Sequence, residues 1–567
     1  MAENADFADF VSVFHKRVGG AVRGLLADWG TPGLEDDFVL EPASKRGHGD
    51  LATNMALVAA SHLRQQPRQL AERLVEAMRL DARLRDLARF EIAGPGFINF
   101  HLHASVLVNA ARDALVRGSQ FGARTQARPQ KILMEFVSAN PTGELHVGHA
   151  RYAAYGDSLK RILAFIGNDV AAEFYINDFG AQMENFGASV AARYAQALGL
   201  EVELPADGYR GEYPRYLAEK IRGEIGSRLR GEIEPATTGK AVDFFKQRGC
   251  EIVLEEMKAE LDRFRVRFDN WFSEAGLYRS GAPGKVVEKL KDLGEAFEKE
   301  GALWLKTTGH GDDKDRVLIR GNGEPTYFAS DIAYHVDKLS RPEHYDHLVN
   351  IWGADHHGYV SRVKAAMQAL FPDRDEPEII IGQLVNVIEM GERKQMSKRK
   401  GTMVTLKELL AGIGVDAARF FLVDRSHDST LDLDMEKARL KSEENPVYYV
   451  QYAHARIFSI IKKAAAENFK PVDYAGYDAL SSQERQLILS ILFFPQVVQG
   501  AATGREPHRL TAYSRDLAGA FHTFYHNCPV LKAEPQTASF RLDLCLLVRN
   551  TIARSLDLVG VSAPEAM

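Results

Sequence analysis

Cysteine is scarce in this 567-residue sequence, which contains only Cys250, Cys528 and Cys545. No two of them form a C-x-x-C pair, which argues against a disulfide framework and against a zinc site built on cysteines. We therefore expect three reduced thiols and a cytoplasmic location, because disulfides persist mainly in oxidising compartments.

Long hydrophobic runs and an excess of positive charge are also missing. The longest apolar run, Leu487–Phe494, stops at Pro495 and is far shorter than the roughly 20 residues of a membrane span. The N-terminal MAENADFADF is acidic and polar, unlike a signal peptide. We expect no membrane association. The formal net charge is −6, so any nucleic-acid binding must come from local patches such as RKQMSKRK at 393–400.

The length predicts about three or four domains. Near the N-terminus, helical patterns over Phe7–Leu26 and Met55–Met78 and an alternating strand pattern over Pro95–His103 indicate a small α/β module. The polar segment 123–129 ends in proline, as a linker does. The C-terminal part is nearly all helical in pattern. We expect domains at residues 1–122, 123–435 and 436–567.

The middle of the chain begins with a strand–turn–helix–strand unit. KILMEFVS (131–138) has a strand pattern, and ANPTGEL turns the chain with Asn140, Pro141 and Gly143. A helical pattern then runs from His146 to Gly167, and DVAAEFYIND (169–178) is a second strand. A βαβ unit predicts a parallel, doubly wound sheet of the Rossmann-like kind.

The remainder of the middle domain is less regular. Residues 183–310 are charged and mostly helical in pattern, which indicates a large helical insertion. Further strand-like segments are TYFAS (326–330), HLVNIWG (347–353) and EIIIGQLV (378–385).

The pattern His146-Val147-Gly148-His149 lies where the first strand passes into the helix. A helix N-terminus presents unpaired N–H groups and a partial positive charge, so it attracts phosphate. The two histidines add donors, and Gly148 lets a flat ring or a backbone approach closely. This motif predicts phosphate binding without a glycine-rich P-loop, and the sequence has no GxxxxGK[ST].

A second motif, Met396-Ser397-Lys398-Arg399-Lys400-Gly401, follows a predicted strand. Its Lys398 lies 252 residues after His146. Lys398 is placed to neutralise charge on a leaving pyrophosphate. A basic loop alone is more often a solvated surface. Two phosphate-binding motifs in this order around one sheet are a much stronger signal than either motif alone.

These motifs resemble a known family. Class I aminoacyl-tRNA synthetases pair an H-x-G-H element with a K-M-S-K-S-like loop, and EFVSANPTGELHVGHAR (135–151) resembles their arginine-specific, bacterial-type member. The resemblance extends over YINDFGAQ (175–182), WGADHHGY (352–359), NPVYYVQYAHAR (445–456) and the terminal APEAM (563–567). Two departures are Gln395, at the usual first lysine of the second motif, and Glu144, where proline is common.

The resemblance implies an enzyme that activates L-arginine with ATP and Mg²⁺ to arginyl-adenylate and transfers it to the 3′ end of tRNA(Arg). A monomer without zinc is expected, although GADHH superficially resembles a metal site. His146, His149 and Lys398 would be catalytic. The residues that would bind ATP are His146, Gly148, His149, Gly353, Asp355, His356, Met396, Ser397 and Lys398.

The resemblance also implies an arginine pocket made of Glu135, Ser138, Asn140, Tyr327 and Asp331. Tyr327 and Asp331 are four residues apart and match the family's guanidinium-reading pair, so they face one way if a helix begins there. The alternatives are core packing for Tyr327 and an N-cap for Asp331. The sequence does not order the carboxylates Glu135 and Asp331 along the substrate.

For tRNA, the resemblance implies contacts at both ends of the chain. The N-terminal domain would contact the tRNA elbow, with Phe97 and Asn99 enclosing an unstacked base; the alternative for Phe97 is core packing. In the helical C-terminal domain, Tyr452, Arg456 and Met567 would shape the anticodon pocket.

Three other functions share parts of this pattern. A small-molecule nucleotidylyltransferase also uses H-x-G-H but needs far fewer residues and no helical C-terminal domain. A non-catalytic RNA-binding paralogue is expected to have lost His146, His149 or Lys398, which are all present. A synthetase for another amino acid would carry zinc ligands or a larger editing insertion than residues 183–310 allow.

Overall fold

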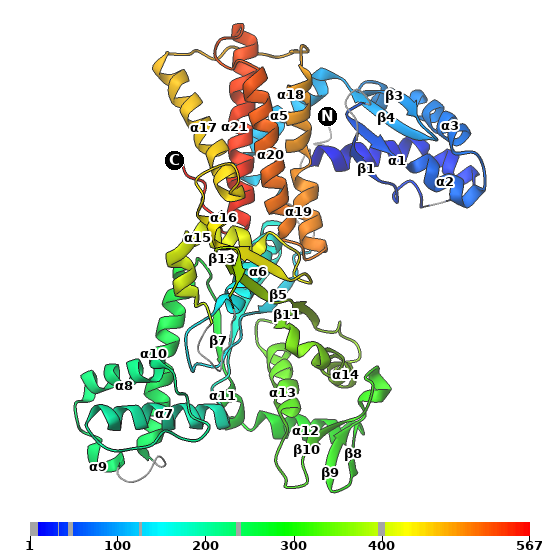
Figure 1. Cartoon of the computed structure of the whole chain (residues 1–567). Helices are drawn as coiled ribbons and strands as arrows, with labels where there is room; N and C mark the ends of the chain where they lie inside the picture. The colour runs from blue at the N-terminus through cyan, green and yellow to red at the C-terminus, as the bar shows by residue number, and fades with distance from the viewer. Residues whose placement is uncertain (1–8, 32, 44–48, 124–127, 234–239, 395–402) are drawn as a thin grey trace. The chain divides into compact units, whose positions relative to one another are not determined.

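The structure is a computed structural model that describes residues 9–31, 33–43, 49–123, 128–233, 240–394 and 403–567. The chain forms two compact units (Figure 1). Unit 1 comprises Met1–Thr125, Lys441–Leu558 and Ser562–Met567, and unit 2 comprises Gln126–Leu440 and Val559–Val561. The second motif, with Met396, Ser397 and Lys398, lies outside the described residues.

Unit 2 is built on a five-stranded parallel sheet with the order β12-β11-β5-β6-β7, which confirms the predicted Rossmann-like architecture. Strands β6 and β7 lie on one side of β5, and β11 and β12 on the other. The order therefore reverses between β5 and β11, the place where doubly wound sheets bind ligands beyond the carboxyl ends of their strands. The strands are β5 (Lys131–Glu135), β6 (Asp169–Ile176), β7 (Asn270–Ser273), β11 (His347–Gly353) and β12 (Glu378–Gly382).

The range 183–310 differs from the predicted helical insertion. Its helical stretch ends at α10, and the short β7 then returns to the central sheet. The four residues of β7 stand among charged helices, so they give almost no periodic signal. An antiparallel sheet with the order β10-β9-β8 follows. The elements are α7 (Ala181–Ala197), α8 (Glu212–Ile225), α9 (Arg230–Ile233), α10 (Lys240–Arg263), α11 (Glu274–Arg279), α12 (Ala282–Asp292), β8 (Ala296–Lys299), β9 (Ala302–Leu305), η3 (Thr307–His310) and β10 (Arg316–Ile319).

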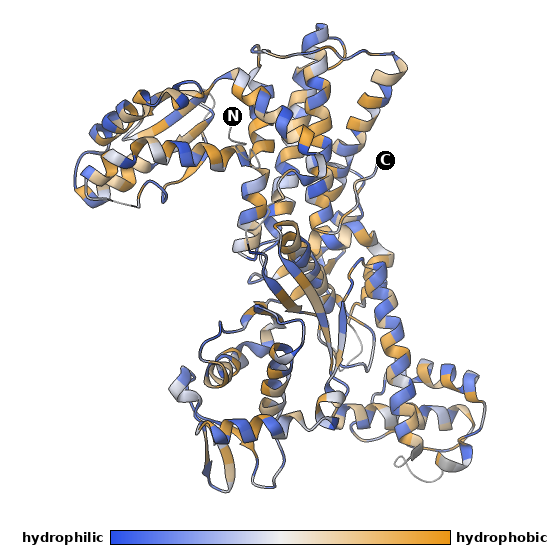
Figure 2. Cartoon of the chain, turned by 180° about the vertical axis from the view of Figure 1, so that it is seen from behind, coloured by the Kyte–Doolittle hydropathy of each residue, from blue (hydrophilic) through white to orange (hydrophobic). Residues whose placement is uncertain are grey.

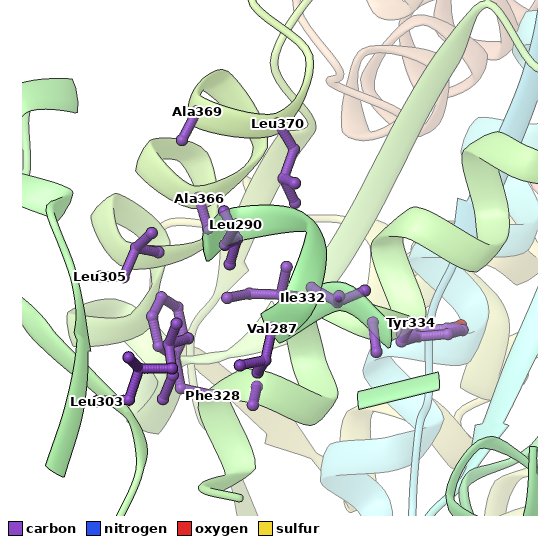
Figure 3. Close-up of a cluster of buried hydrophobic side chains, with 14 of the residues drawn as sticks. Val287, Leu290, Leu303, Leu305, Phe328, Ile332, Tyr334, Ala366, Ala369 and Leu370 are labelled. Atoms are coloured by element: carbon purple, nitrogen blue, oxygen red, sulfur yellow. The ribbon is translucent and has the colours of Figure 1, made fainter. Parts of the chain in front are cut away.

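The segment TYFAS, predicted as a strand, begins helix α13 (Tyr327–Ser340), so that prediction was wrong. The Thr326 hydroxyl caps the helix by accepting from the Ala329 N–H at 3.4 Å. This N-cap overrides the strand propensity of the aromatic residues. Beneath α13, Phe328 and Ile332 pack into an apolar cluster (Figure 3). The other members of this cluster come mainly from α12, β9 and α14 (Val360–Leu370).

The remaining elements of unit 2 connect or adjoin the strands of the central sheet. Helix α6 (Val147–Phe165) joins β5 to β6, and α15 (Leu406–Val423) packs against α6. Fully buried Arg419 of α15 bonds Asp157 at 2.6 Å and donates to the Val559 carbonyl at 2.9 Å. The remaining elements are η4 (Ala354–Tyr359), β13 (Val385–Glu389), β14 (Glu392–Arg393), β15 (Leu431–Asp434) and α16 (Met435–Arg439).

The N-terminal part of unit 1 is an antiparallel sheet with the order β1-β2-β4-β3 and helices packed on it. The helical stretch predicted over Met55–Met78 is two helices, because Arg64 takes a left-handed conformation and Pro67 starts a new helix. The elements are α1 (Phe10–Asp28), β1 (Leu40–Pro42), β2 (Leu51–Thr53), α2 (Met55–Leu63), α3 (Pro67–Leu80), α4 (Ala82–Arg85), β3 (Ala88–Ala93), β4 (Phe97–Leu102), α5 (Ala104–Arg117) and η2 (Gly118–Gln120).

The C-terminal part of unit 1 is helical, as predicted, and its helices carry polar and apolar residues together (Figure 2). Arg485 of α18 bonds both carboxylate oxygens of Asp50 in the N-terminal part. The helices are α17 (Pro446–Ala466), α18 (Ser482–Leu492), α19 (Phe494–Thr503), α20 (His508–Asn527) and α21 (Pro535–Leu558).

One segment, Ser482–Thr503, is long and apolar enough to cross a membrane by length and composition alone. It exceeds the run Leu487–Phe494 because it joins α18 to α19 across Phe493. Half of the residues in its most apolar 18-residue stretch are buried in the protein. The core helix of a soluble protein can have the same length and hydropathy, so this segment is weak evidence for a membrane span.

Candidate active site

A cavity of about 1040 Å³ lies at the carboxyl ends of β5 and β11, where the strand order reverses. Its walls come from the turn after β5, the first turn of α6, the start of α13 and η4. The structure brings every predicted arginine-binding and ATP-binding residue that it describes to this one cavity: Glu135, Ser138, Asn140, His146, Gly148, His149, Tyr327, Asp331, Gly353, Asp355 and His356.

His146 is the N-cap of α6, and its Nδ1 accepts from the Gly148 N–H at 3.2 Å. His149 Nδ1 accepts from the His146 N–H at 3.3 Å, and the two rings stack with centroids 3.7 Å apart. Because both Nδ1 atoms accept, each neutral ring carries its proton on Nε2. A Cβ at Gly148 would lie 3.0 Å from the His146 ring, so glycine permits this stacked pair.

Described residues on either side of the second motif lie against the same cavity. The cavity is lined by Arg393 and Lys394, which precede the motif, and by Met403, which follows it. The Val147 N–H donates to the Val404 carbonyl at 2.9 Å, and the Leu406 N–H donates to the Leu145 carbonyl at 2.7 Å. The chain that follows the second motif is therefore bonded to the start of the first.

Glu135, at the end of β5, is already paired. Its Oε2 lies 2.6 Å from the Lys338 ammonium of α13, and both side chains are buried. Ser138 donates to Oε1 at 2.8 Å, and Lys338 also donates to Asn350 at 2.9 Å. Burial acts to raise the pKa of Glu135, but the charge and hydrogen bond of Lys338, together with His335 and Ser138, outweigh it and the pKa is lowered. Glu135 is thus an ionised carboxylate that already has its cation.

Asp331 and Glu274 have no such cation. Burial, reinforced by the nearby carboxylates Glu274 and Glu135, raises the pKa of Asp331 to about 8. Burial likewise raises the pKa of Glu274 to about 7, although Tyr175 donates a hydrogen bond to it. Glu274 Oε2 is buried without a hydrogen-bond partner, and no cationic side chain in the described part of the chain pairs with either carboxylate. Two acids forced together in this way favour a cationic ligand.

Sequence reasoning missed Glu274 and Lys338. Glu274 follows the N-cap Ser273 and begins α11, where an acidic residue is ordinary, so no local signal marked it. The alternatives for Tyr327 and Asp331 do not hold. The Tyr327 side chain is 60% exposed, which excludes core packing, and Thr326 is the N-cap in place of Asp331.

The two strands at the expected adenosine region end in glycine, which leaves room for the Tyr152 ring. Gly353 ends β11, and Gly382 ends the neighbouring β12. A Cβ at Gly382 would clash with the Tyr152 ring, and one at Gly353 would lie 3.4 Å from the Tyr152 hydroxyl. Asp355 and His356 follow in η4, with His356 Nε2 3.7 Å from Asp355 Oδ2.

The predicted RNA-binding residues lie in unit 1, in two places. Phe97 begins β4 and is 37% exposed, so it is not a core residue. Asn99 points to the same face of β4 but is buried, at 3% exposure. On α17, the Arg456 guanidinium lies over the rings of Tyr452 and Tyr525, 5.0 and 5.1 Å from their centroids.

The C-terminal segment lies along α17. Gln451 of α17 donates to the Ser562 carbonyl at 2.9 Å, and the His454 ring bonds the Pro564 carbonyl at 2.8 Å. Met567, three residues later, is half exposed. The structure therefore places this end of the chain against the helix that carries Tyr452 and Arg456.

Three family profiles match the chain. Residues 110–457 match the catalytic domain of class I (R) tRNA synthetases, residues 450–567 a DALR anticodon binding domain, and residues 14–102 the arginyl-tRNA synthetase N-terminal domain. With the parallel sheet and the histidine motif at its switch point, these matches define a class I aminoacyl-tRNA synthetase.

Comparison with individual relatives identifies the family within this class. The arginine–tRNA ligase of Bacillus pumilus is 45% identical over 534 residues, which cover 94% of each chain. That of Bacillus subtilis is 43% identical over 533 residues. The chain belongs to the arginyl-tRNA synthetase family. The structure of Thermus thermophilus arginyl-tRNA synthetase has the same fold, with a TM-score of 0.78, 24% identity and coverage of 98% of this chain and 100% of that one.

Proposed function

We propose that the cavity of unit 2 holds arginine and ATP side by side and makes arginyl-adenylate, which tRNA(Arg) then accepts. The observation that carries this assignment is the pair Asp331 and Glu274, two carboxylates without a cation beside the His146 motif. A guanidinium is a permanent, planar cation with five N–H donors, and carboxylates can receive these donors in parallel.

The proposed orientation follows from the charges. The guanidinium lies at Asp331 and Glu274, with Tyr327 closing one side. Glu135 is neutralised by Lys338, so with Ser138 and Asn140 it serves the polar end of arginine rather than the guanidinium. The arginine carboxylate then faces the first turn of α6, where ATP would place its phosphates.

The proposed chemistry needs little proton transfer by side chains. ATP enters with its Mg²⁺, the arginine carboxylate attacks the α-phosphate in line, and pyrophosphate leaves. The terminal ribose hydroxyl of the tRNA then attacks the adenylate carbonyl and releases AMP. The Nε2–H groups of His146 and His149 are the proposed donors to the phosphates, and catalysis is positioning and charge stabilisation. From the sequence alone, Met396, Ser397 and Lys398 are proposed to bind the leaving pyrophosphate.

The adenosine of ATP is proposed to lie along Gly353, Asp355 and His356. In unit 1, Phe97 and Asn99 are proposed to contact the tRNA elbow, and Tyr452, Arg456 and Met567 the anticodon. The domain division 1–122, 123–435 and 436–567 is proposed on the same basis. Burial raises the pKa of the Cys250 and Cys545 thiols to about 12, which suits inert thiols in a reducing cytoplasm.

The decisive experiment is ATP–pyrophosphate exchange with each of the twenty amino acids, with and without tRNA. We expect exchange with arginine alone, and only when tRNA is present, as the family resemblance implies. His146→Asn should lower the rate roughly 10²-fold or more, like the loss of one preorganised donor. Exchange with a different amino acid would overturn the assignment of the pocket.

A further inference from the structure

A second cavity, of about 700 Å³, lies behind the active site in unit 2. The two cavities share η4 as a wall. Asp355, His356 and Tyr359 line the active site, whereas His357 and Gly358 line the second cavity. The two cavities thus lie next to each other on either side of this short helix.

Four cationic side chains and the carboxylates Asp313 and Glu376 line the second cavity, and two of the cations have no ion pair among the described residues. Arg316 bonds Asp312 at 2.7 Å, and Lys364 lies 3.3 Å from Glu376. Lys314 and Arg362, in contrast, have no ion pair within the described ranges of the chain. The Arg362 Nε is buried and has no hydrogen-bond partner there. Its guanidinium lies 4.6 Å from the centroid of the Tyr359 ring. Stacking thus positions a cation that lacks an anion.

The remaining wall is apolar. Ile379 and Ile381 alternate along the edge strand β12, so they point to the same face of the sheet, and Val360 lies beside them. An apolar surface below a cationic rim suits a nucleotide, because ribose and base cover the apolar part while the phosphate meets the cations. A free inorganic anion would gain nothing from the isoleucines.

We propose that this second cavity binds the single-stranded 3′ end of tRNA, with Lys314 and Arg362 on its backbone phosphates, just upstream of the nucleotide that enters the active site. The inference rests on the proposed function, which makes tRNA a substrate whose 3′ end must reach the active site. Neither residue touches the reacting atoms, so both are positioning residues for the RNA.

The test compares intact tRNA with tRNA trimmed of its single-stranded 3′ end. The variants are Lys314→Gln and Arg362→Gln. Lys285→Gln is the control, because Lys285 is an exposed lysine of α12 outside the cavity. For each variant we expect a roughly three- to tenfold loss of affinity for intact tRNA and a salt slope smaller by about one. Affinity for the trimmed tRNA should match the wild type, because the contact is already absent.

Equal losses for intact and trimmed tRNA would overturn the proposal, as would wild-type affinity for both. Arg362→Lys, which keeps the charge, should recover part of the affinity; a loss as large as that of Arg362→Gln would indicate a packing role. The cations could bind either the phosphates of the RNA backbone or pyrophosphate, and pyrophosphate inhibition of aminoacylation separates these two ligands. The variants should keep wild-type inhibition, and weakened inhibition would make the cavity a pyrophosphate site.

The proposed function is tested separately by the wild-type protein. A wild type that does not charge tRNA with arginine would refute that function, whereas a wild type that charges normally alongside unaffected variants would refute only the RNA site. The KM for arginine should be unchanged in both variants.

Discussion

The Lys338 ammonium lies 2.6 Å from Glu135 Oε2, and both groups are buried at the base of the active site. The pair separates the roles of the acidic side chains in the cavity. Glu135 already has a cation from the protein, whereas Asp331 and Glu274 do not. We therefore propose that Asp331 and Glu274 recognise the cationic substrate.

Asp331→Asn keeps the shape of the side chain but removes its charge. Losing one partner of a buried charged pair costs about 3–5 kcal/mol, which is roughly 10²–10⁴ in kcat/KM for arginine. Discrimination against neutral citrulline should shrink as well. Tyr327→Phe is the milder comparison, at about 0.5–1.5 kcal/mol. Steady-state aminoacylation with arginine and citrulline measures both. Wild-type efficiency and wild-type rejection of citrulline in Asp331→Asn would remove this residue from recognition.

Glu135→Gln should act on stability, because it leaves the Lys338 charge buried without a carboxylate. Lys338→Met should likewise leave Glu135 buried without a cation. Each single change is expected to lower the free energy of unfolding by about 3–5 kcal/mol. The double variant, in which no charge remains, should lose less than the sum of the two. Thermal unfolding checks this. Strictly additive losses would mean that the two groups do not interact.

The raised pKa values of Asp331 and Glu274 make arginine binding depend on pH. Near pH 7 the ligand-free site holds protons that a guanidinium must displace, so binding should release protons and the KM for arginine should fall as the pH rises from about 6 to about 8. Calorimetry in two buffers of different ionisation enthalpy measures the release. Asp331→Asn should reduce it. Binding at pH 7 without proton release would contradict the raised pKa values.

The same two groups affect stability in the opposite direction. In the unfolded chain both carboxyls ionise near about pH 4. Between about pH 4 and 8 the ligand-free folded protein therefore binds more protons than the unfolded chain. Their contribution to the free energy of unfolding falls as the pH rises through this range. Saturating arginine should abolish this trend, because both carboxyls are then ionised in the folded protein as they are in the unfolded chain.

For the RNA contacts of unit 1, Arg456→Ala and Phe97→Ala should each weaken tRNA binding by about 1–3 kcal/mol. Tyr452→Phe keeps the ring under Arg456 but removes the hydroxyl that accepts from it at 2.6 Å, so its effect should be smaller. Val39→Ala, another exposed apolar residue of the N-terminal part, is the control for Phe97. Filter binding at stated salt measures all four, and wild-type affinity in Arg456→Ala or Phe97→Ala would exclude that residue from the RNA interface.

Gly560→Ala should destabilise the protein strongly. Gly560 has φ +69°, and a Cβ there would clash with the guanidinium of the fully buried Arg419. Gly323→Ala is the matched control in the same unit, because Gly323 also has a positive φ (+85°) but a Cβ there would meet no atom within 4 Å. The control should cost only the backbone strain of about 1–2 kcal/mol. Thermal unfolding that is equal in the two variants would show that Arg419 can move aside.

The sequence predicted those elements whose structure is determined by residues close together in the chain. The unit of β5, α6 and β6 follows from hydrophobic periodicity and turn residues, and the H-x-G-H motif marked the cavity. The start of α13 was misjudged because Thr326 caps a helix inside a run of residues that favour strands. The pairing of Glu135 was out of reach, because its partner Lys338 is 203 residues away. Glu274 carries no local pattern, so only the fold reveals it.

The bond between Arg419 and the Val559 carbonyl also bears on how the protein is made. The two residues are 140 positions apart, and nearly all of the chain between Lys441 and Leu558 belongs to unit 1. During synthesis, the Arg419 guanidinium therefore lacks one of its carbonyl acceptors until the whole helical bundle has left the ribosome. A fragment cut after Leu440 would bury the same guanidinium without that acceptor. Unit 2 is thus contiguous in space but not in sequence, and Arg419 gains its last carbonyl acceptor only when the segment Val559–Val561 docks.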